Sequence, residues 1–122
     1  MKLRWFKWVC VAVMLCGLAG SAVAGTATPA DFTGKEWQRS STSEKLAFLY
    51  GVSSTVAIEH LVAEKQGTEA SVFVSAWLKA FGDESWTQIQ KKLDDWYAAH
   101  PAESGRSVFD VLWYEFMAPD DK

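Results

Sequence analysis

Apolar residues recur at helical spacing through most of the chain after position 40. The first stretch, EKLAFLYGVSSTVAIEHLVAEK, runs from Glu44 to Lys65 and is apolar on nearly every side in its first half. Ser41 followed by Glu44 is a capping-box pattern, and a glycine at position 67 suits the residue that follows a helix end. We therefore expect one long helix that begins after Ser41 and runs to about Gln66.

A glycine lies inside this long helix. Gly51 costs about 1 kcal/mol relative to alanine in a helix interior. Its neighbours Ser53, Ser54 and Ala57 are also small. We expect a thin side of the helix there, where another helix or an aromatic ring approaches closely. A groove for a ligand is the alternative.

Three more stretches have apolar residues at helical spacing, and each ends at a glycine or a proline. The clearest stripe is formed by Trp86, Ile89, Leu93, Trp96 and Tyr97. The expected helices cover residues 69–80, residues from a cap at Asp83 or Ser85 to the His100-Pro101 step, and residues 107–117 with Ser107 as the cap. No stretch alternates with period two for long enough to predict a strand. The sequence thus predicts an all-α fold, a compact bundle of about four helices.

The N-terminal residues have the pattern of a secretion signal. Lys2, Arg4 and Lys7 precede an apolar run, and the small residues Ala22 and Ala24 form an A-x-A site, so we expect cleavage after Ala24. The run is shorter than the roughly 20 residues that span a bilayer, which argues against a stable membrane anchor. Cys16 follows a leucine, unlike a lipoprotein cysteine. We expect a periplasmic protein with residues 1–24 as signal, 25–40 as a flexible leader and arm pinned by Phe32 and Trp37, 41–118 as a helical domain and 119–122 as an acidic tail.

Cleavage changes the charge and removes both cysteines. Three of the 12 basic residues and none of the 15 acidic ones leave with the signal, so the formal charge becomes −6. Such a charge argues against nucleic acid and anionic lipid as partners and suits a basic protein partner. Cys10 and Cys16 both lie in the signal, so the exported chain has no disulfide, thiol nucleophile or cysteine-based metal site.

Few residues indicate a catalytic or metal site. His60 and Glu64 share one helical face, but a zinc site usually needs three or four protein ligands. A second candidate set is Asp94 and Asp95 with His100, although adjacent helical residues do not face each other. We expect His60 to be structural, and we expect no catalytic residue, no cofactor and no enzyme activity. A site formed by His60 and Glu64 is the weaker alternative.

The aromatic residues are a better indication of function. Trp77 and Phe81 close one helix, and Trp113, Tyr114 and Phe116 crowd the last one. A bundle this small cannot easily bury all of these rings, although burial of every one is the alternative. We expect a partner surface on the last helix, formed by Trp113 and Tyr114 as anchors with Asp110 one turn before Tyr114.

The segments GKEWQRSSTSEKLAFLYGV and IQKKLDDWYAAHPAESGRSVFDVLWYEF resemble the small secreted helical proteins of the Rap1a/Tai type. The shared pattern includes the Tyr50-Gly51 step, a helix that ends at His100-Pro101, and a last helix with Val108, Val111, Leu112 and Trp113. This resemblance covers roughly two-thirds of the chain after the signal.

The Rap1a/Tai family comprises periplasmic immunity proteins against type VI secretion effectors. The resemblance implies a non-catalytic protein that neutralises a secreted effector by occluding it, and such an effector could be basic. The alternatives are a periplasmic protein that binds a small ligand or a metal through His60, Glu64 and the Gly51 groove, and an accessory subunit of an envelope complex.

Overall fold

The computed structural model describes residues 32–118 and residue 120, and its regular secondary structure in these residues is helical apart from one isolated antiparallel bridge. The expected signal peptide and its cleavage site lie outside the described residues, as does most of the acidic tail. The elements are α1 (Gly34–Arg39), α2 (Thr42–Gln66), α3 (Val72–Phe81), α4 (Trp86–Ala99), the 3₁₀ turn η2 (Pro101–Glu103), α5 (Val108–Val111) and the π-helix η3 (Leu112–Met117). The all-α prediction is confirmed.

Side-chain caps set most helix ends where the sequence places them. Ser41 and Glu44 form the predicted capping box of α2, and Gly67 follows that helix with φ of 65°. Ser85 and Ser107 cap α4 and α5. The expected start of α3 near residue 69 is wrong, because Ser71 is its N-cap. The residues before Ser71 complete the end of α2, where the Thr68 N–H donates to the Ala63 carbonyl (3.0 Å).

Residues 34–39 form a short helix that the sequence pattern does not predict. Thr33 and Glu36 form a capping box at its start, and Trp37 within it is fully buried. Phe32 packs against the same core, so the expectation that Phe32 and Trp37 pin this arm is confirmed. Backbone bonds also tie the arm to the segment before α5: the Gly34 N–H donates to the Arg106 carbonyl (3.0 Å), and the Val108 N–H donates to the Phe32 carbonyl (2.9 Å).

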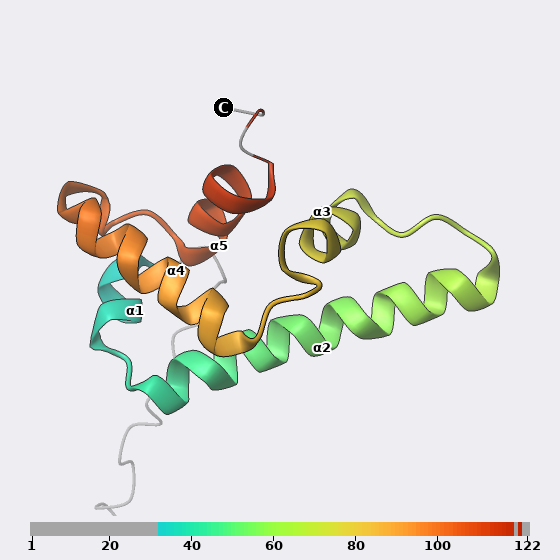
Figure 1. The fold of residues 1–122 in the computed structure, drawn as a ribbon, viewed down its shortest axis with the longest axis horizontal. Coiled ribbons are helices and arrows are strands. Elements are labelled where there is room, and N and C mark those ends of the chain that lie inside the picture. The colour runs from blue at the N-terminus through green and yellow to red at the C-terminus, as the bar shows by residue number, and fades with distance from the viewer. Residues whose placement is uncertain (1–31, 119, 121–122) are drawn as a thin grey trace, which may run out of the picture.

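The long helix α2 forms one edge of the molecule, and the other helices all lie on one side of it (Figure 1). It contributes Leu49, Val56 and Ala63 to the buried residues, at seven-residue spacing on one face. The close approach expected at Gly51 is absent: a Cβ atom built there would have no described neighbour within 4 Å. By length and composition alone, α2 is the one described helix that could cross a membrane. Of its most apolar 18-residue window, 17% is buried against the rest of the protein.

The last helix changes its winding after one turn. The Ala118 N–H donates to the Trp113 carbonyl, five residues earlier (2.7 Å), which is the π-helical spacing. Val108, Val111 and Leu112 of the predicted inner stripe are buried, whereas Phe116 is only partly buried. Met117 is buried instead, because the wider turn moves the inward position from a four-residue to a five-residue step.

The core is rich in aromatic rings that meet edge to face. Trp77 and Phe81 are 4% and 3% exposed, so both belong to the core rather than to a surface patch. Their ring centroids lie 5.0 Å apart, and Trp77 also lies beside Phe73. Edge-to-face pairs of this kind stabilise a small core that has no disulfide among its described residues.

Candidate functional site

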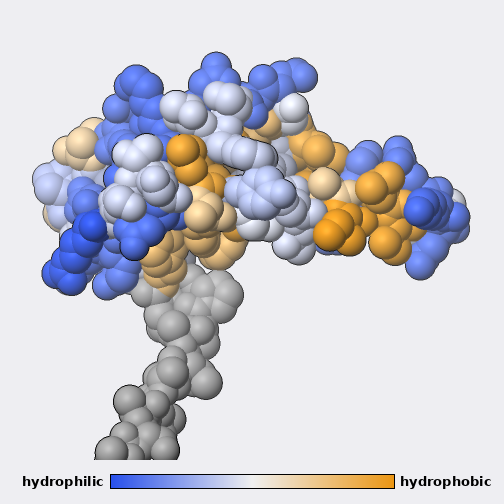
Figure 2. Space-filling model, turned by 90° about the horizontal axis from the view of Figure 1, so that it is seen from below, coloured by the Kyte–Doolittle hydropathy of each residue, from blue (hydrophilic) through white to orange (hydrophobic). Residues whose placement is uncertain are grey.

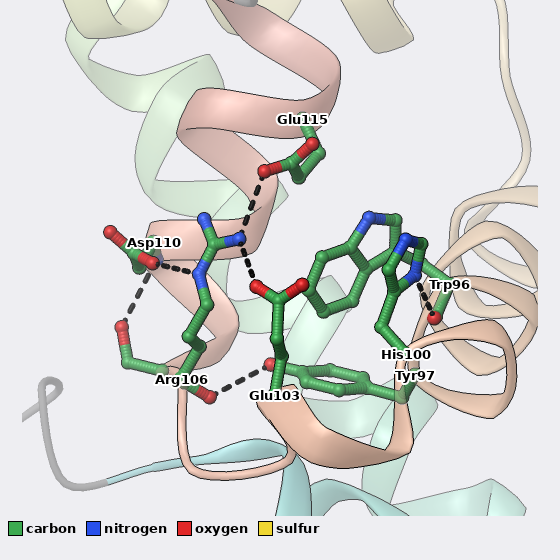
Figure 3. Close-up of polar contacts among 8 residues, drawn as sticks. Trp96, Tyr97, His100, Glu103, Arg106, Asp110 and Glu115 are labelled. Carbon is green, nitrogen blue, oxygen red and sulfur yellow. Dashed lines mark hydrogen bonds and ion pairs between the residues drawn. The ribbon is translucent and has the colours of Figure 1, made fainter. Parts of the chain in front are cut away.

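A cluster of charged side chains forms where the chain turns from α4 into α5. Pro101 ends α4 and starts the short turn η2, which brings Arg106 back toward the last helix. The guanidinium of Arg106 contacts three carboxylates: Glu103 at 2.9 Å, Asp110 at 2.6 Å and Glu115 at 2.9 Å (Figure 3). We call these four residues the Arg106 cluster.

The aromatic end of α4 supports this cluster from one side. The Arg106 guanidinium lies 5.1 Å from the centre of the Trp96 ring, which in turn stacks on His100 with 4.4 Å between ring centroids. His100 Nδ1 lies 2.8 Å from the Trp96 carbonyl oxygen (Figure 3). Because a carbonyl can only accept, the imidazole proton belongs on Nδ1. The stack therefore holds Arg106 in place by cation–π attraction.

The backbone of Arg106 is held as firmly as its side chain. Its carbonyl accepts from the Tyr97 hydroxyl (3.0 Å) and from the Gly34 N–H (3.0 Å). Tyr97 is fully buried, and burial raises the pKa of its phenol to about 12. The hydroxyl therefore stays protonated at neutral pH and remains a hydrogen-bond donor to the loop.

The cluster carries a net negative charge at a solvent-accessible edge. The formal charges of its three carboxylates and one guanidinium sum to −2. The side chains of Glu103, Asp110 and Arg106 are 44%, 38% and 27% exposed. Burial lowers the pKa of Arg106, but hydrogen bonds from its guanidinium to Asp110, Glu103 and Glu115 outweigh that effect and raise the pKa above its ordinary value. The site is thus a fixed acidic surface.

The three residues expected at the partner surface have different environments. Asp110 belongs to the Arg106 cluster, and its backbone N–H donates to the hydroxyl oxygen of Ser107, the N-cap of α5 (3.0 Å). Trp113 is half-buried and lies nearly parallel to Phe73 of α3, with 6.4 Å between ring centroids, so it packs at the core edge. Tyr114 is half-buried. The structure thus places Asp110 in an acidic surface and directs Trp113 toward α3.

Sequence reasoning missed Arg106, Glu103 and Glu115. Glu103 and Asp110 lie three residues before and four residues after Arg106, and this spacing is a recognisable signal for ion pairs on helical turns. Glu115 lies nine residues from Arg106 and reaches it only because η3 packs beside the loop. No local pattern could have identified that pair.

The other candidate sets have ordinary structural contacts. His60 Nε2 lies 3.4 Å from a Glu64 oxygen, and both side chains are substantially exposed. Within the described residues, no group of three or more His, Cys, Asp or Glu side chains could hold a metal ion. Two cavities of about 180 Å³ lie on either side of Val56, and neither is lined by His60, Glu64 or Gly51.

Asp94, Asp95 and His100 are not brought together. Asp95 pairs with Lys91 (2.6 Å), and His100 stacks on Trp96. Asp94 accepts from the Trp37 indole and from Lys45, so it links α4 to α1 and α2.

Comparison with known proteins found no matching family model, no matching curated protein and no matching solved structure.

Proposed function

We propose that this chain is a non-catalytic periplasmic binding protein that uses the Arg106 cluster to bind a basic protein. The observation that carries the proposal is the pair of exposed carboxylates, Glu103 and Asp110, that Arg106 holds in place at one edge of the molecule. Such a surface attracts a positively charged partner and orients it, since the carboxylates are already ordered before binding.

The resemblance to Rap1a/Tai proteins suggests which basic protein this is. We propose a type VI secretion effector that the chain neutralises by covering its surface. Tyr114, half-buried on η3, and Asp110 of the cluster both belong to the last helical segment, so they could contact one partner. Trp113 has a supporting role in this proposal, because it packs on Phe73.

The test uses the purified effectors of the producing organism's type VI system as probes. Association rate and affinity are measured by surface plasmon resonance at low and at high salt, and neutralisation by survival of cells that export the effector. We expect Asp110→Asn and Glu103→Gln to slow association and to flatten the salt dependence. We expect Tyr114→Ala to lower affinity about thirtyfold, the effect of about 2 kcal/mol that a lost aromatic anchor produces.

The matched control is Asp95→Asn. It removes an exposed carboxylate that contacts Lys91 and does not touch Arg106, so total charge changes equally in both variants. If Asp95→Asn and Asp110→Asn have the same small effect, general charge attraction and not the Arg106 cluster carries binding. If no effector binds or is neutralised, the immunity role is refuted.

A further inference from the structure

The side of α2 that faces away from the other helices is apolar and exposed. Its residues, which we call the outer face, are Ala47, Tyr50, Gly51, Ser54, Ile58, Leu61 and Val62; all are exposed except the half-buried Ser54, and Tyr50 also contacts Trp86 of α4. Tyr50, Ile58 and Leu61 are 55%, 63% and 52% exposed. Figure 2 shows apolar side chains gathered toward the protruding end of this helix. At 3.6 residues per turn, the outer face continues for roughly four turns without a charged residue.

This face has more apolar surface than a solvated helix needs. A surface helix normally has polar residues opposite its buried stripe, and a helix that is apolar all round is normally buried. In α2, Leu49, Val56 and Ala63 face the core, while the opposite side is apolar as well. Exposed apolar patches of this kind mark interaction surfaces.

Gly51 supports the same conclusion independently. Among the described residues, only Gly67 has a positive φ, so the backbone at Gly51 does not require glycine. A Cβ atom there would meet nothing within 4 Å. The glycine therefore costs α2 about 1 kcal/mol without any benefit inside the monomer. It would allow close approach of another helix.

We propose that the outer face binds a second copy of this chain, with the two α2 helices antiparallel about a two-fold axis between Ser54 and Thr55. This register places Gly51 opposite Ile58 and Ala47 opposite Val62, so these two large side chains each meet a small one. It also places Glu44 of each copy opposite Lys65 of the other. These two residues bound the outer face at its ends and carry opposite charges.

The position of the other helices permits this arrangement. All of them lie on the inner side of α2, so in the dimer the two bodies occupy opposite sides of the helix pair (Figure 1). The exposed Trp86, whose ring meets Tyr50 edge to face at 4.8 Å, extends the contact beside α2. A parallel pair is disfavoured, because Glu44 would meet Glu44 and Lys65 would meet Lys65.

A lipid surface fits the outer face less well. Helices that lie on membranes usually carry lysine and arginine beside their apolar face. Here Glu59 and Glu64 accompany Lys65 near the exposed end of α2. Anionic headgroups would repel these carboxylates, whereas a second copy offers Lys65 as a matching cation for Glu44. The dimer does not involve the Arg106 cluster, so either proposal can fail alone.

The first experiment measures the mass of the exported protein in solution by sedimentation over a range of concentrations. We expect a reversible dimer that Ile58→Glu weakens at least tenfold in dissociation constant, because each copy would bury an unpaired charge. Val72→Glu is the matched control: Val72 is 75% exposed, but it lies at the start of α3 and outside the outer face. It should leave the dimer unchanged.

The second experiment tests the antiparallel register by charge reversal. Lys65→Glu and Glu44→Lys should each weaken the dimer, because each places like charges opposite one another at both ends. Mixing the two variants should restore association, since every facing pair in the mixed dimer is again Glu with Lys. Glu44 also caps α2, so Glu44→Gln, which keeps an acceptor for the Ser41 N–H, is the folding control.

Three results would overturn the proposal. These are a monomer at every concentration, a dimer that Ile58→Glu does not weaken, and no restoration when the two charge variants are mixed. Flotation with phosphatidylcholine–phosphatidylglycerol vesicles addresses the lipid alternative. If a monomeric wild type floats with vesicles and Ile58→Glu does not, the outer face binds lipid and the dimer is refuted.

Discussion

The carboxylate of Asp94 on α4 accepts a hydrogen bond of 2.8 Å from the indole N–H of Trp37 on α1, although the two residues are 57 positions apart. The same oxygen accepts from Lys45 Nζ of α2 at 2.8 Å, and Gln90 donates to the second oxygen at 3.3 Å. One side chain thus joins three helices. Its position explains how a short N-terminal helix is held against the body.

Removing this carboxylate should destabilise the fold. Asp94→Ala leaves the N–H of the fully buried Trp37 without its acceptor. It also removes the carboxylate that pairs with Lys45, whose side chain is only 13% exposed. We expect a loss of about 1–3 kcal/mol in the free energy of unfolding. Chemical denaturation of the purified protein measures it. Asp95→Ala removes the adjacent carboxylate, which pairs with Lys91 at the surface, and should cost less than about 1 kcal/mol.

Asp94 should also make the free energy of unfolding depend on pH in the acidic range. Burial raises the pKa of this carboxyl, but hydrogen bonds from Lys45, Trp37 and Gln90 outweigh burial and lower the pKa below its ordinary value. A group whose pKa is lowered by folding stabilises the protein above its unfolded pKa, and that contribution is lost as pH falls toward the folded value. We expect stability to decline below about pH 4. Asp94→Asn should decline less steeply in denaturation experiments across this range, and equal slopes would contradict this assignment.

Gly34 should tolerate no side chain. A Cβ atom at this position would lie 2.2 Å from Cε1 of the buried Tyr97 ring. Gly34→Ala must therefore displace Tyr97 or α1, and we expect a loss of about 1–3 kcal/mol as in other overpacked cores. Thermal denaturation compares it with Gly51→Ala. Because Gly51 has open space around it, alanine there should leave the melting temperature of the isolated monomer unchanged or raised.

Arg106 should stabilise the protein mainly by neutralising its three carboxylates. Arg106→Gln removes the guanidinium that Glu103, Asp110 and Glu115 share, and we expect a loss of about 1–3 kcal/mol in the free energy of unfolding at neutral pH. Their mutual repulsion disappears when they are protonated. The difference in unfolding free energy between wild type and variant should therefore shrink as pH falls below about 5. A difference that stays constant with pH would mean that packing on Trp96 dominates.

Export should remove the first 24 residues. Mass spectrometry of the protein recovered from the periplasm should show a chain that begins at Gly25. An intact Met1, or a lipid attached to Cys16, would contradict the predicted processing. The same preparation should show no change in far-UV circular dichroism on addition of a reducing agent, because both cysteines precede the cleavage site.

Local signals in the sequence determined most of the helices. Helix caps act within one helical turn, so they can be predicted without knowledge of tertiary contacts. This applies to the N-caps Ser41, Ser85 and Ser107 and to Gly67 after α2. The start of α3 was less predictable, because the residues after Gly67 can either complete one helix or begin the next. The hydroxyl of Ser71 caps α3 and so fixes its start at Val72.

Only the tertiary structure decided how the distant polar groups meet. Asp94 lies on a helix face whose sequence resembles a solvated surface, and only the docking of α1 and α2 turns it into a half-buried acceptor for Trp37. Glu115 reaches Arg106 because the last helix widens and packs beside the loop. The apolar composition of α2 was evident from the sequence, but its side chains could be assigned to the core or to the outer face only after the neighbouring helices were in place. Caps and stops are interactions between residues near in sequence, whereas burial and ion pairing at these positions depend on which helices pack together.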